Sequence, residues 1–487
     1  MAHTVEKIGG TSMSDYGSVR DNIFLNEQLG GDIYSRIFVV SAYGGITNRL
    51  LEHKKSGEAG IYALFSGSTS EEGWVQALST LKAELLSINH DLFGDSDLLL
   101  AANSFICDRL DSAKTVLKDL QSLCQHGHFS LSEHLATVRE MLASIGEAHS
   151  AYNTAELLKR DGVNACFVDL TAWNEGKHLS LDERIQQAFS DVDVENTLPI
   201  VTGYAHSREG LMKVFDRGYS EMTFSRIAVI TQASEAIIHK EFHLSSADPN
   251  IVGEANAVPI GRTNYDVADQ LANIGMEAIH PKAAKGLRQQ DIPLRVKNTF
   301  QPEHTGTLIT RDYVSEQPCV EIVAGCKGVY AVEVFDQEMA GSVQEYDKQF
   351  LNIVGRFKGH VITKDVNANT ITHYLKGNLK TIKRIVNALT EVYVDAEIRY
   401  QKVSLVSAFG SDMQVSGMLA KAVSSLADAG ISILAMHQSM RQVDMQFILL
   451  EDDYEGAIKA LHECLVEVHN HGEAIELAPY RMDVNVA

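Results

Sequence analysis

Short apolar runs that end in glycine pairs punctuate the first 50 residues of the chain. Residues 37–41 form an unbroken apolar run closed by a serine, which is typical of a strand buried on both faces of a parallel sheet. Residues 3–7 are predicted to form an earlier strand, and residues 20–29 a helix between the two. Each predicted strand runs into a glycine pair, and Thr47 or Asn48 can cap a helix after the second pair. The pattern indicates the opening of an α/β unit.

Residues 71–160 follow a different period. Apolar side chains recur there at steps of three and four residues, as in the series Trp74, Leu78, Leu81, Leu85 and Ile88. The spacing predicts long amphipathic helices. Strands are then predicted at 165–169, 198–203 and 293–297, with helices between them. Alternating strands and helices predict a three-layer α/β/α domain with a mostly parallel sheet.

The last third of the chain is built from shorter units. Residues 301–318 contain Pro302, Gly306 and Pro318 and are predicted to be a linker. Beyond it, a strand–helix–strand–strand–helix order in 403–468 is compatible with a ferredoxin-like fold, and a looser copy precedes it in 329–390. The predicted domains are therefore 1–312, 313–398 and 399–487, with two ferredoxin-like α+β domains in tandem after the first.

The composition narrows the class of protein. The chain has 64 acidic and 42 basic residues, a net charge of −22, which makes it a poor general binder of nucleic acid or of anionic membranes. The acidity is explained either by solubility or by a salt-rich cytoplasm. The N-terminus lacks the apolar core of a signal peptide, and no apolar run approaches the roughly 20 residues that span a bilayer. The six cysteines form no CxxC pair, so we expect reduced thiols in a cytoplasmic protein.

The two glycine pairs carry the first chemical signal. In the segment from Lys7 to Ser12, Gly9 and Gly10 let backbone amides approach an anion, and Lys7 adds a positive charge. Alone, this glycine pair is a weak signal and is better explained as a plain turn. The second pair, Gly44-Gly45, also enters a helix whose N-terminal amides favour phosphate. Since the sequence has no GxxxxGK[ST] loop, the two turns together indicate a nucleotide phosphate site of another kind.

The order of the motifs resembles the aspartate kinases of the amino acid kinase superfamily. The resemblance begins with Lys7-Ile8-Gly9-Gly10-Thr11-Ser12 and Ser41-Ala42-Tyr43-Gly44-Gly45. It continues, in order, through Ser144-Ile145-Gly146-Glu147, Thr202-Gly203, Arg217-Gly218-Tyr219-Ser220-Glu221, Asp248-Pro249, His280-Pro281 and the stretch 291–309. It extends into the tail, which looks like the paired ACT regulatory domains of that family. The fold it implies is an amino acid kinase-like domain followed by two ACT-type domains.

The resemblance implies ATP-dependent phosphorylation of the side-chain carboxylate of L-aspartate, with Mg²⁺ but no metal held by the protein's own ligands. The implied contacts to ATP phosphates are Lys7, Gly9, Gly10, Ser12, Ser41, Gly44 and Gly45. The implied contacts to aspartate are Thr47, Glu147, Arg217 and Ser220, and those counted as catalytic are Lys7, Glu147 and Arg217. A carboxylate nucleophile with a pKa of about 4 is already ionised and needs no general base. The opposing interpretations stay open: Glu147 as a solvated helical acid, and Arg217 in a surface ion pair with Asp216.

Several positions depart from the family pattern. An aspartate is replaced by Glu221, a glycine by Tyr219, and a lysine that normally helps to bind ATP by Glu277. The stretch 239–243 replaces the family's adenine-side residues, so Lys240 is a candidate replacement cation. Asp248 and Pro249 are further adenine-side candidates. These departures resemble the divergent aspartate kinases associated with ectoine synthesis in salt-tolerant bacteria.

Two alternative functions and one regulatory question follow from the same sequence. The chain could be another small-molecule kinase of the superfamily, or a catalytically impaired amino-acid sensor. For the tail, the resemblance implies a threonine or lysine effector and a homodimer or higher homo-oligomer formed through the ACT-like domains. Candidate effector contacts are Met339, Gly341, Asp365 and Asn367. A dimerisation scaffold without a ligand is the alternative.

Overall fold

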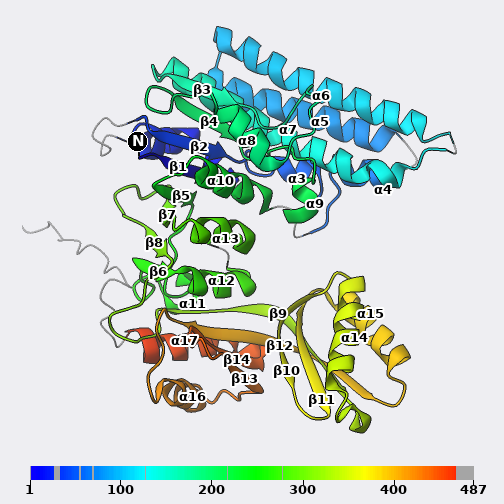
Figure 1. The fold of residues 1–487 in the computed structure, drawn as a ribbon, viewed down its shortest axis with the longest axis vertical. Helices are drawn as coiled ribbons and strands as arrows, with labels where there is room; N and C mark the ends of the chain where they lie inside the picture. Colours follow the sequence, from blue (N-terminus) through cyan, green and yellow to red (C-terminus); the bar gives the residue numbers. More distant parts are fainter. Residues whose placement is uncertain are drawn as a thin grey trace, which may run out of the picture. The chain divides into compact units, whose positions relative to one another are not determined.

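The computed structural model describes residues 2–26, 33–53, 56–67, 71–126, 128–215, 218–276 and 278–467. The chain divides into two compact units (Figure 1). The first comprises residues 1–243 and 279–311, and the second comprises residues 244–278 and 312–487. The segment 244–278, which the sequence placed inside the first domain, thus belongs to the second unit. No helix of the described residues combines the length and the apolar character needed to cross a membrane.

The first unit is organised around a mostly parallel sheet with the order β3-β4-β2-β1-β5-β7-β8. Its strands are β1 (Thr4–Ile8), β2 (Arg36–Val40), β3 (Ala165–Val168), β4 (Leu198–Thr202), β5 (Glu235–Lys240), β7 (Leu294–Asn298) and β8 (Thr307–Thr310). Among the pairs formed by these seven described strands, the β7–β8 pair alone is antiparallel. The α/β architecture with a mostly parallel sheet is confirmed.

The order of the strands creates a switch point at β1. The chain passes from β1 to β2 on one side and later returns to β5 on the other side of β1. In open parallel sheets, ligands bind beyond the carboxyl ends of the strands at such a point. The loops after β1, β2, β4 and β5 all leave from that edge, so the topology brings both predicted glycine turns to one place.

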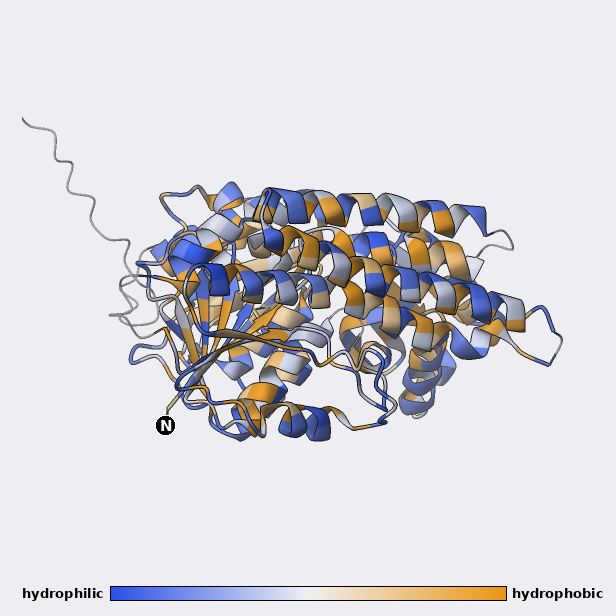
Figure 2. Cartoon of the chain, turned by 90° about the horizontal axis from the view of Figure 1, so that it is seen from above, coloured by the Kyte–Doolittle hydropathy of each residue, from blue (hydrophilic) through white to orange (hydrophobic). Residues whose placement is uncertain are grey.

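Three long helices account for the predicted helical region. These are α5 (Glu72–Phe93), α6 (Asp97–Leu123) and α7 (Leu131–Arg160), and the long helices carry both apolar and polar residues (Figure 2). Helix α7 differs from the other two because its middle is buried all round, from Leu142 to Ala151. The remaining helices of the unit are shorter: α1 (Gly10–Met13), α2 (Tyr16–Val19), a π-helical turn (Arg20–Phe24), α3 (Ile46–Leu50), α4 (Ile61–Gly67), α8 (Leu181–Phe189), α9 (Leu211–Phe215), α10 (Tyr219–Ile230) and α13 (Pro281–Gln289).

The second unit is built on a six-stranded antiparallel sheet with the order β10-β11-β9-β12-β14-β13. Its strands are β9 (Ile322–Phe335), β10 (His360–Val366), β11 (Thr370–Lys376), β12 (Glu397–Phe409), β13 (Ala435–Gln438) and β14 (Asp444–Leu450). Its helices are α11 (Pro249–Val252), α12 (Tyr265–Asn273), α14 (Val343–Arg356), α15 (Leu379–Val392), α16 (Met418–Asp428) and α17 (Tyr454–His462). The unit also contains a short strand, β6 (Arg262–Asn264), two 3₁₀ turns (Gln337–Met339 and Glu451–Asp453) and a π-helical turn (Glu463–Glu467).

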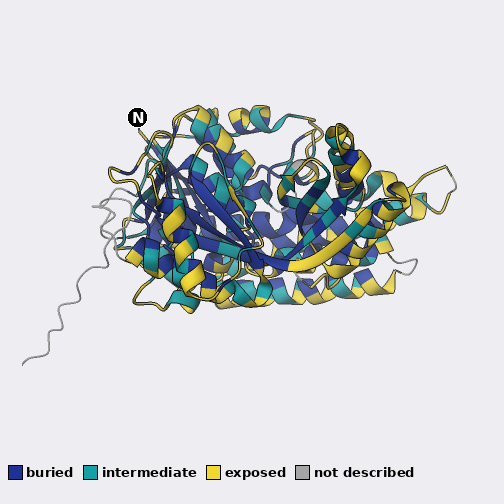
Figure 3. Cartoon of the chain, turned by 90° about the horizontal axis from the view of Figure 1, so that it is seen from below, coloured by how far each residue is buried: buried dark blue, intermediate teal, exposed yellow. Residues whose placement is uncertain are grey.

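The two predicted tandem copies share strands. One apolar core gathers residues from the end of β9 with α14 and α15, whereas another gathers the start of β9 with β12, β14, α16 and α17. Strands β9 and β12 pair along 12 registered positions and run through both halves. The predicted boundary between 398 and 399 therefore falls inside a continuous strand. The first residues of β12 are mostly exposed and its last seven are buried (Figure 3).

The predicted linker at 301–318 contains the strand β8, and a linker throughout this stretch is therefore wrong. The strand forms because of a tight turn at Gly306. Its φ is +78°, and a Cβ at this position would lie 2.3 Å from the carbonyl oxygen of Val296. The tight turn reverses the chain onto β7, where Thr307 pairs with Val296. Periodicity could not reveal a four-residue strand whose existence depends on this turn.

Gly306→Ala tests the turn. We expect a destabilisation of about 2 kcal/mol or more, because the added methyl meets a backbone oxygen and the φ is left-handed. The matched control is Gly73→Ala in the first turn of α5, where a Cβ meets nothing within 4 Å. Thermal unfolding of both variants should show a lower midpoint for Gly306→Ala only. Equal midpoints would contradict the role of the turn.

Candidate active site

The two glycine turns pack against each other at the sheet edge. A Cβ on Gly10 would lie 2.6 Å from the carbonyl oxygen of Ala42, so only glycine fits there. The amide of Gly44 donates to Ser14 Oγ at 2.8 Å. Gly45, with φ +86°, is the N-cap of α3. The expected Thr47 or Asn48 cap is therefore wrong, since a left-handed glycine starts the helix and Thr47 lies in its first turn.

Lys7 projects from β1 into a largely buried pair with Glu221 on α10. Its Nζ lies 3.3 Å from Glu221 Oε1, and Lys7 is 8% exposed. Burial pushes the pKa of Glu221 upward, but Lys7, Lys240 and the backbone amide of His280 outweigh it and lower that pKa below its ordinary value. Glu221 is thus ionised at neutral pH. The sequence left the role of Glu221 open, and in the structure Glu221 forms an ion pair with Lys7.

Glu147 lies inside the unit on α7 with no comparable pair. It is 2% exposed, and burial raises its pKa to about 8, although Lys7, the Tyr219 side chain and the Ala42 amide favour the ionised form. Its Oε2 is buried without a hydrogen-bond partner among the described residues. A Cβ on Gly203 would come 2.7 Å from that oxygen. The alternative of a solvated helical acid is therefore wrong.

Other predicted contacts surround the same edge of the sheet. Ser220 is 8% exposed beside Gly203, whose added Cβ would lie 3.0 Å from the Ser220 Cβ. The amide of Ser41 donates to the Ile8 carbonyl, and the Ser41 carbonyl accepts from Ser150 Oγ on α7. These contacts join the second glycine turn to the helix that carries Glu147. Ser12 is fully buried, with its Oγ 3.0 Å from Thr299 Oγ1.

The remaining predicted residues are distributed as follows. Lys240 ends β5 in the first unit, close enough to Glu221 to lower its pKa. Asp248 and Pro249 belong to the second unit, where Asp248 caps α11 by accepting from the Asn250 amide. Arg217 and Glu277 lie outside the described residues.

A buried charge cluster beneath the glycine turns was missed by sequence reasoning. Arg36 Nε donates to Glu6 Oε1 at 2.7 Å, and His239 Nε2 lies 2.7 Å from Glu6 Oε2. Burial disfavours the Glu6 carboxylate, yet Arg36 and His239 lower the pKa of Glu6 strongly. All three residues are at most 8% exposed. The cluster joins β1, β2 and β5, the three strands that meet at the switch point.

The four effector candidates occupy two different places in the second unit. Gly341 lines a cavity of about 760 Å³ with residues at the start of α14 and with Tyr393. Asp365 and Asn367 line a separate cavity of about 810 Å³. Met339 is fully buried in an apolar core. The sequence grouped these residues, whereas the structure assigns them to different surroundings.

Known families match both ends of the chain. Residues 3–298 match the amino acid kinase family, and residues 395–463 match the ACT domain. An aspartate kinase called Ask_Ect from Stutzerimonas stutzeri (strain A1501) is 55% identical over 98% of this chain and 100% of its own length. Aspartokinase 2, chloroplastic, from Arabidopsis thaliana is 24% identical over 95% of this chain and 84% of its own.

Solved structures share the fold at low identity. Aspartokinase III of E. coli in complex with aspartate and ADP (R-state) matches with a TM-score of 0.71 at 18% identity, covering 95% of this chain and 99% of that one. The same enzyme in complex with lysine and aspartate (T-state) matches with a TM-score of 0.73, also at 18% identity and with the same coverage. This likeness confirms the predicted fold.

Arg36→Met tests the buried cluster. Removing the cation leaves Glu6 buried and short of partners, and we expect a loss of roughly 3–5 kcal/mol of stability. Arg20→Met is the control, because its pair with Asp21 is exposed and should contribute less than about 1 kcal/mol. The unfolding midpoint in denaturant distinguishes the two. A double variant, Glu6→Gln with Arg36→Met, should recover part of the loss, and no recovery would contradict the assigned cause.

Proposed function

The chain belongs to the amino acid kinase family and is an aspartate kinase, and from this premise we propose how its site phosphorylates the side-chain carboxylate of L-aspartate with ATP. The identity of 55% to Ask_Ect over nearly the whole chain supports the activity and the divergent, ectoine-associated subtype. The product is 4-phospho-L-aspartate, an acyl phosphate of amino-acid or ectoine biosynthesis. A cytoplasmic location remains a prediction.

One observation carries the assignment of the substrate site. Glu147 is a buried acid whose Oε2 has no partner in the described part of the chain. A buried polar atom without a partner is costly unless a ligand supplies one. The ammonium of aspartate supplies both the charge and the hydrogen-bond donor. Its arrival would lower the pKa of Glu147 and release a proton near neutral pH.

The glycine turns and Lys7 suit the ATP phosphates. Gly10 allows no side chain, and Gly44 and Gly45 are exposed at the start of α3, where the Gly44 amide is held by Ser14 Oγ. Lys7 stands at the end of β1, where its charge can neutralise the transferred phosphoryl group. Glu221 positions that ammonium through the 3.3 Å contact. Glu221 thus orients the Lys7 ammonium without itself forming a hydrogen bond to the substrate.

The transfer needs no general base. An oxygen of the aspartate side-chain carboxylate attacks the γ-phosphorus, a new P–O bond forms, and the bond to the β-phosphate oxygen breaks with its electron pair leaving on ADP. Both reactants are anionic, so positioning and cationic side chains provide most of the rate. We assign Arg217 to the α-carboxylate of aspartate, with Thr47 and Ser220 beside it, because a guanidinium binds a carboxylate bidentately.

Mg²⁺ fits this site as a partner of the nucleotide. Within the described ranges, no cluster of three or more His, Cys, Asp or Glu side chains is placed to hold a metal ion. Mg²⁺ commonly keeps several waters and binds through substrate phosphates with few protein ligands. When bound, it would offset negative charge on the phosphates of ATP. The residues Lys7 and Lys240 would share that task from the protein side.

For the tail, we propose that an amino acid such as lysine or threonine regulates the kinase. The ACT match over residues 395–463 supports a regulatory tail, and the cavity at Gly341 is a candidate effector site at the start of α14. A homodimer or higher homo-oligomer through the six-stranded sheet is proposed with it. Regulation requires a measured coupling between effector and substrate.

Lys7→Ala tests the phosphate site. We expect a fall in kcat of about 10³-fold, because the charge on the transferred phosphoryl group loses its nearest cation. ADP release with aspartate, ATP and Mg²⁺ provides the measurement. Lys82→Ala is the control, since that lysine pairs with Asp111 on the exposed side of α5. Equal rates for the two variants would exclude a catalytic role for Lys7.

Glu147→Gln separates function from stability. We expect the KM for aspartate to rise at least about 100-fold, because the ammonium loses its anionic partner. The folded-state pKa of about 8 lies above the ordinary value of 4.5, so the folded enzyme binds the extra proton and the wild type loses stability as pH rises from 4.5 to 8. The variant should therefore gain in unfolding midpoint relative to wild type, more at pH 8.5 than at pH 5.

The pH profile provides the internal check on that variant. The wild-type KM for aspartate should fall between pH 6 and pH 8 as Glu147 ionises, and the profile of Glu147→Gln should be flat over this range. A variant profile that still falls would mean that another group controls aspartate binding.

A further inference from the structure

The first turn of helix α10 is fixed against His280, the residue that caps α13. A Cβ on Gly218, the N-cap of α10, would lie 2.8 Å from His280 Cδ2, so the two elements are in close contact. The backbone amide of His280 also donates a hydrogen bond to Glu221. Tyr219 and Ser220 of the same turn are buried. The turn therefore presents its side chains to the site from a fixed backbone.

Two buried tyrosines pack together next to α7. The rings of Tyr204 and Tyr219 meet edge to face with their centroids 5.7 Å apart, and the two residues are 2% and 3% exposed. The Tyr204 hydroxyl donates to Glu140 Oε2 at 2.6 Å, whereas the Tyr219 hydroxyl donates to the Glu147 carboxylate. Glu140 and Glu147 are seven residues apart, two turns along one face of α7. Each tyrosine of the pair thus serves a different acid of the same helix.

The donors to Glu147 all meet one of its two oxygens. Its carboxylate accepts from the Tyr219 hydroxyl and from the backbone amide of Ala42. Since Oε2 has no hydrogen-bond partner among the described residues, both donors are assigned to Oε1. Gly203 lies on the other side, where an added Cβ would come 2.7 Å from Oε2. Two donors on one oxygen fix the rotation of the carboxylate and leave the second oxygen facing space that only glycine keeps open.

Few groups near Glu147 favour its ionised form. Burial raises the pKa of Glu147 to about 8, against the opposing effects of Lys7 on β1 and of Tyr219 on α10. Tyr204, in the loop after β4, is neutral because burial keeps its pKa well above the ordinary value. His149, on α7 itself, is neutral because burial lowers its pKa to about 3. In the described part of the chain, Lys7 and Tyr219 are therefore the side chains that favour the carboxylate.

We propose that Tyr219 is a positioning residue for aspartate binding, because its hydroxyl holds one oxygen of Glu147 and directs the other, Oε2, at the substrate ammonium. The inference rests on the proposed function, in which Glu147 binds that ammonium. Tyr219 acts through Glu147 and touches neither the substrate nor the transferred phosphoryl group. The glycine of the family pattern offers no hydroxyl at this position, so the resemblance does not supply this role.

Tyr219→Phe removes the hydroxyl and keeps the ring. A hydrogen bond to the charged form of an acid lowers its pKa, so its loss should raise the pKa of Glu147 by roughly one unit. The ionised acid binds the ammonium, and the fall of KM for aspartate with rising pH should therefore move about one pH unit higher. We expect KM to be about 10-fold above wild type at pH 7 and within about 2-fold of it at pH 9.

Tyr204→Phe is the matched control. It removes the hydroxyl of the neighbouring ring, which serves Glu140, and leaves the two rings in contact. ADP release between pH 6 and pH 9 gives kcat and KM for aspartate for both variants. Tyr219→Phe should keep kcat within about 2-fold, because the hydroxyl does not act on the phosphoryl group. The KM profile of Tyr204→Phe should follow that of the wild type.

Calorimetry of L-aspartate binding in two buffers of different ionisation enthalpy counts the released protons without any turnover. At pH 8 the wild type should release roughly half a proton per site, and Tyr219→Phe roughly nine-tenths, because more of its Glu147 is protonated before binding. Should the phenylalanine variant not fold, Tyr219→3-fluorotyrosine provides the second variant. It keeps the ring nearly unchanged and makes the hydroxyl a stronger donor, so it should release fewer protons than the wild type.

Three results would overturn the role of Tyr219. These are a KM profile of Tyr219→Phe that superimposes on the wild type, a KM raised equally at every pH, and the same shift in Tyr204→Phe. Glu147→Gln measured in parallel distinguishes this failure from that of the proposed function. If Glu147→Gln binds aspartate as tightly as the wild type, the assigned substrate site is wrong and the role of Tyr219 with it. If Glu147→Gln loses affinity and Tyr219→Phe does not change the profile, the positioning role alone is wrong.

Discussion

The arrangement of the first unit depends on how the two buried charges of strand β1 are neutralised. Glu6 and Lys7 are consecutive residues of β1, and side chains of a strand alternate between its faces. Glu6 therefore enters one face, where Arg36 and His239 compensate it, and Lys7 enters the other, where Glu221 does. A central strand of a parallel sheet has no route to water on either face. Each charge needs a partner from another element, and those partners hold the site together.

Glu147 differs from these paired charges, and this difference is the basis of its proposed function. Glu221 has a lowered pKa because Lys7, Lys240 and a backbone amide offset its burial, whereas the pKa of Glu147 is raised because burial outweighs its weaker partners. Both acids lie near Lys7, yet their pKa values are shifted in opposite directions. Glu221 positions the lysine, and in our proposal Glu147 binds the ammonium of the substrate. Environment, not residue type, separates these roles.

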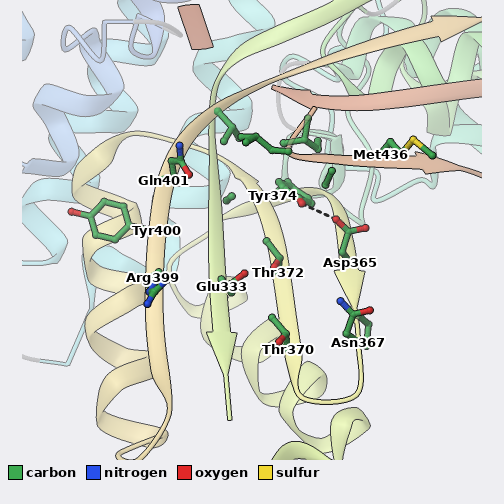
Figure 4. A pocket seen from close by; sticks show the side chains of 16 residues that line it. Glu333, Asp365, Asn367, Thr370, Thr372, Tyr374, Arg399, Tyr400, Gln401 and Met436 are labelled. Atoms are coloured by element: carbon green, nitrogen blue, oxygen red, sulfur yellow. Dashed lines mark hydrogen bonds between the residues drawn. The ribbon is translucent and has the colours of Figure 1, made fainter. Parts of the chain in front are cut away.

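The two faces of the six-stranded sheet in the second unit differ in character. One face is covered by α14 and α15 over an apolar core, and the other presents a row of charged and hydroxyl side chains beside an apolar patch. Because β9 and β12 continue through both halves, the cavity of about 810 Å³ on the second face is lined by side chains from each half (Figure 4).

Local patterns in the sequence determined the sheet class, the long helices and the glycine turns, since hydrophobic period and glycine after a buried strand are properties of neighbouring residues. The proposed roles of Lys7 and Glu147 come from the resemblance to the family and not from the local pattern. The family assignment followed from the ordered motifs and was then confirmed by the comparisons. Arg217 and Glu277 remain predictions because they lie outside the described residues.

Only the tertiary structure decided which charges meet. Glu6 and His239 are 233 residues apart, and Lys7 and Glu221 are 214 apart, so no local pattern links them. The strand β8 also escaped prediction, because its pairing depends on Gly306 fitting against a carbonyl of β7. The sequence by itself determined which elements form and which chemistry they carry. The fold decided the protonation states, since desolvation depends on everything packed around a group.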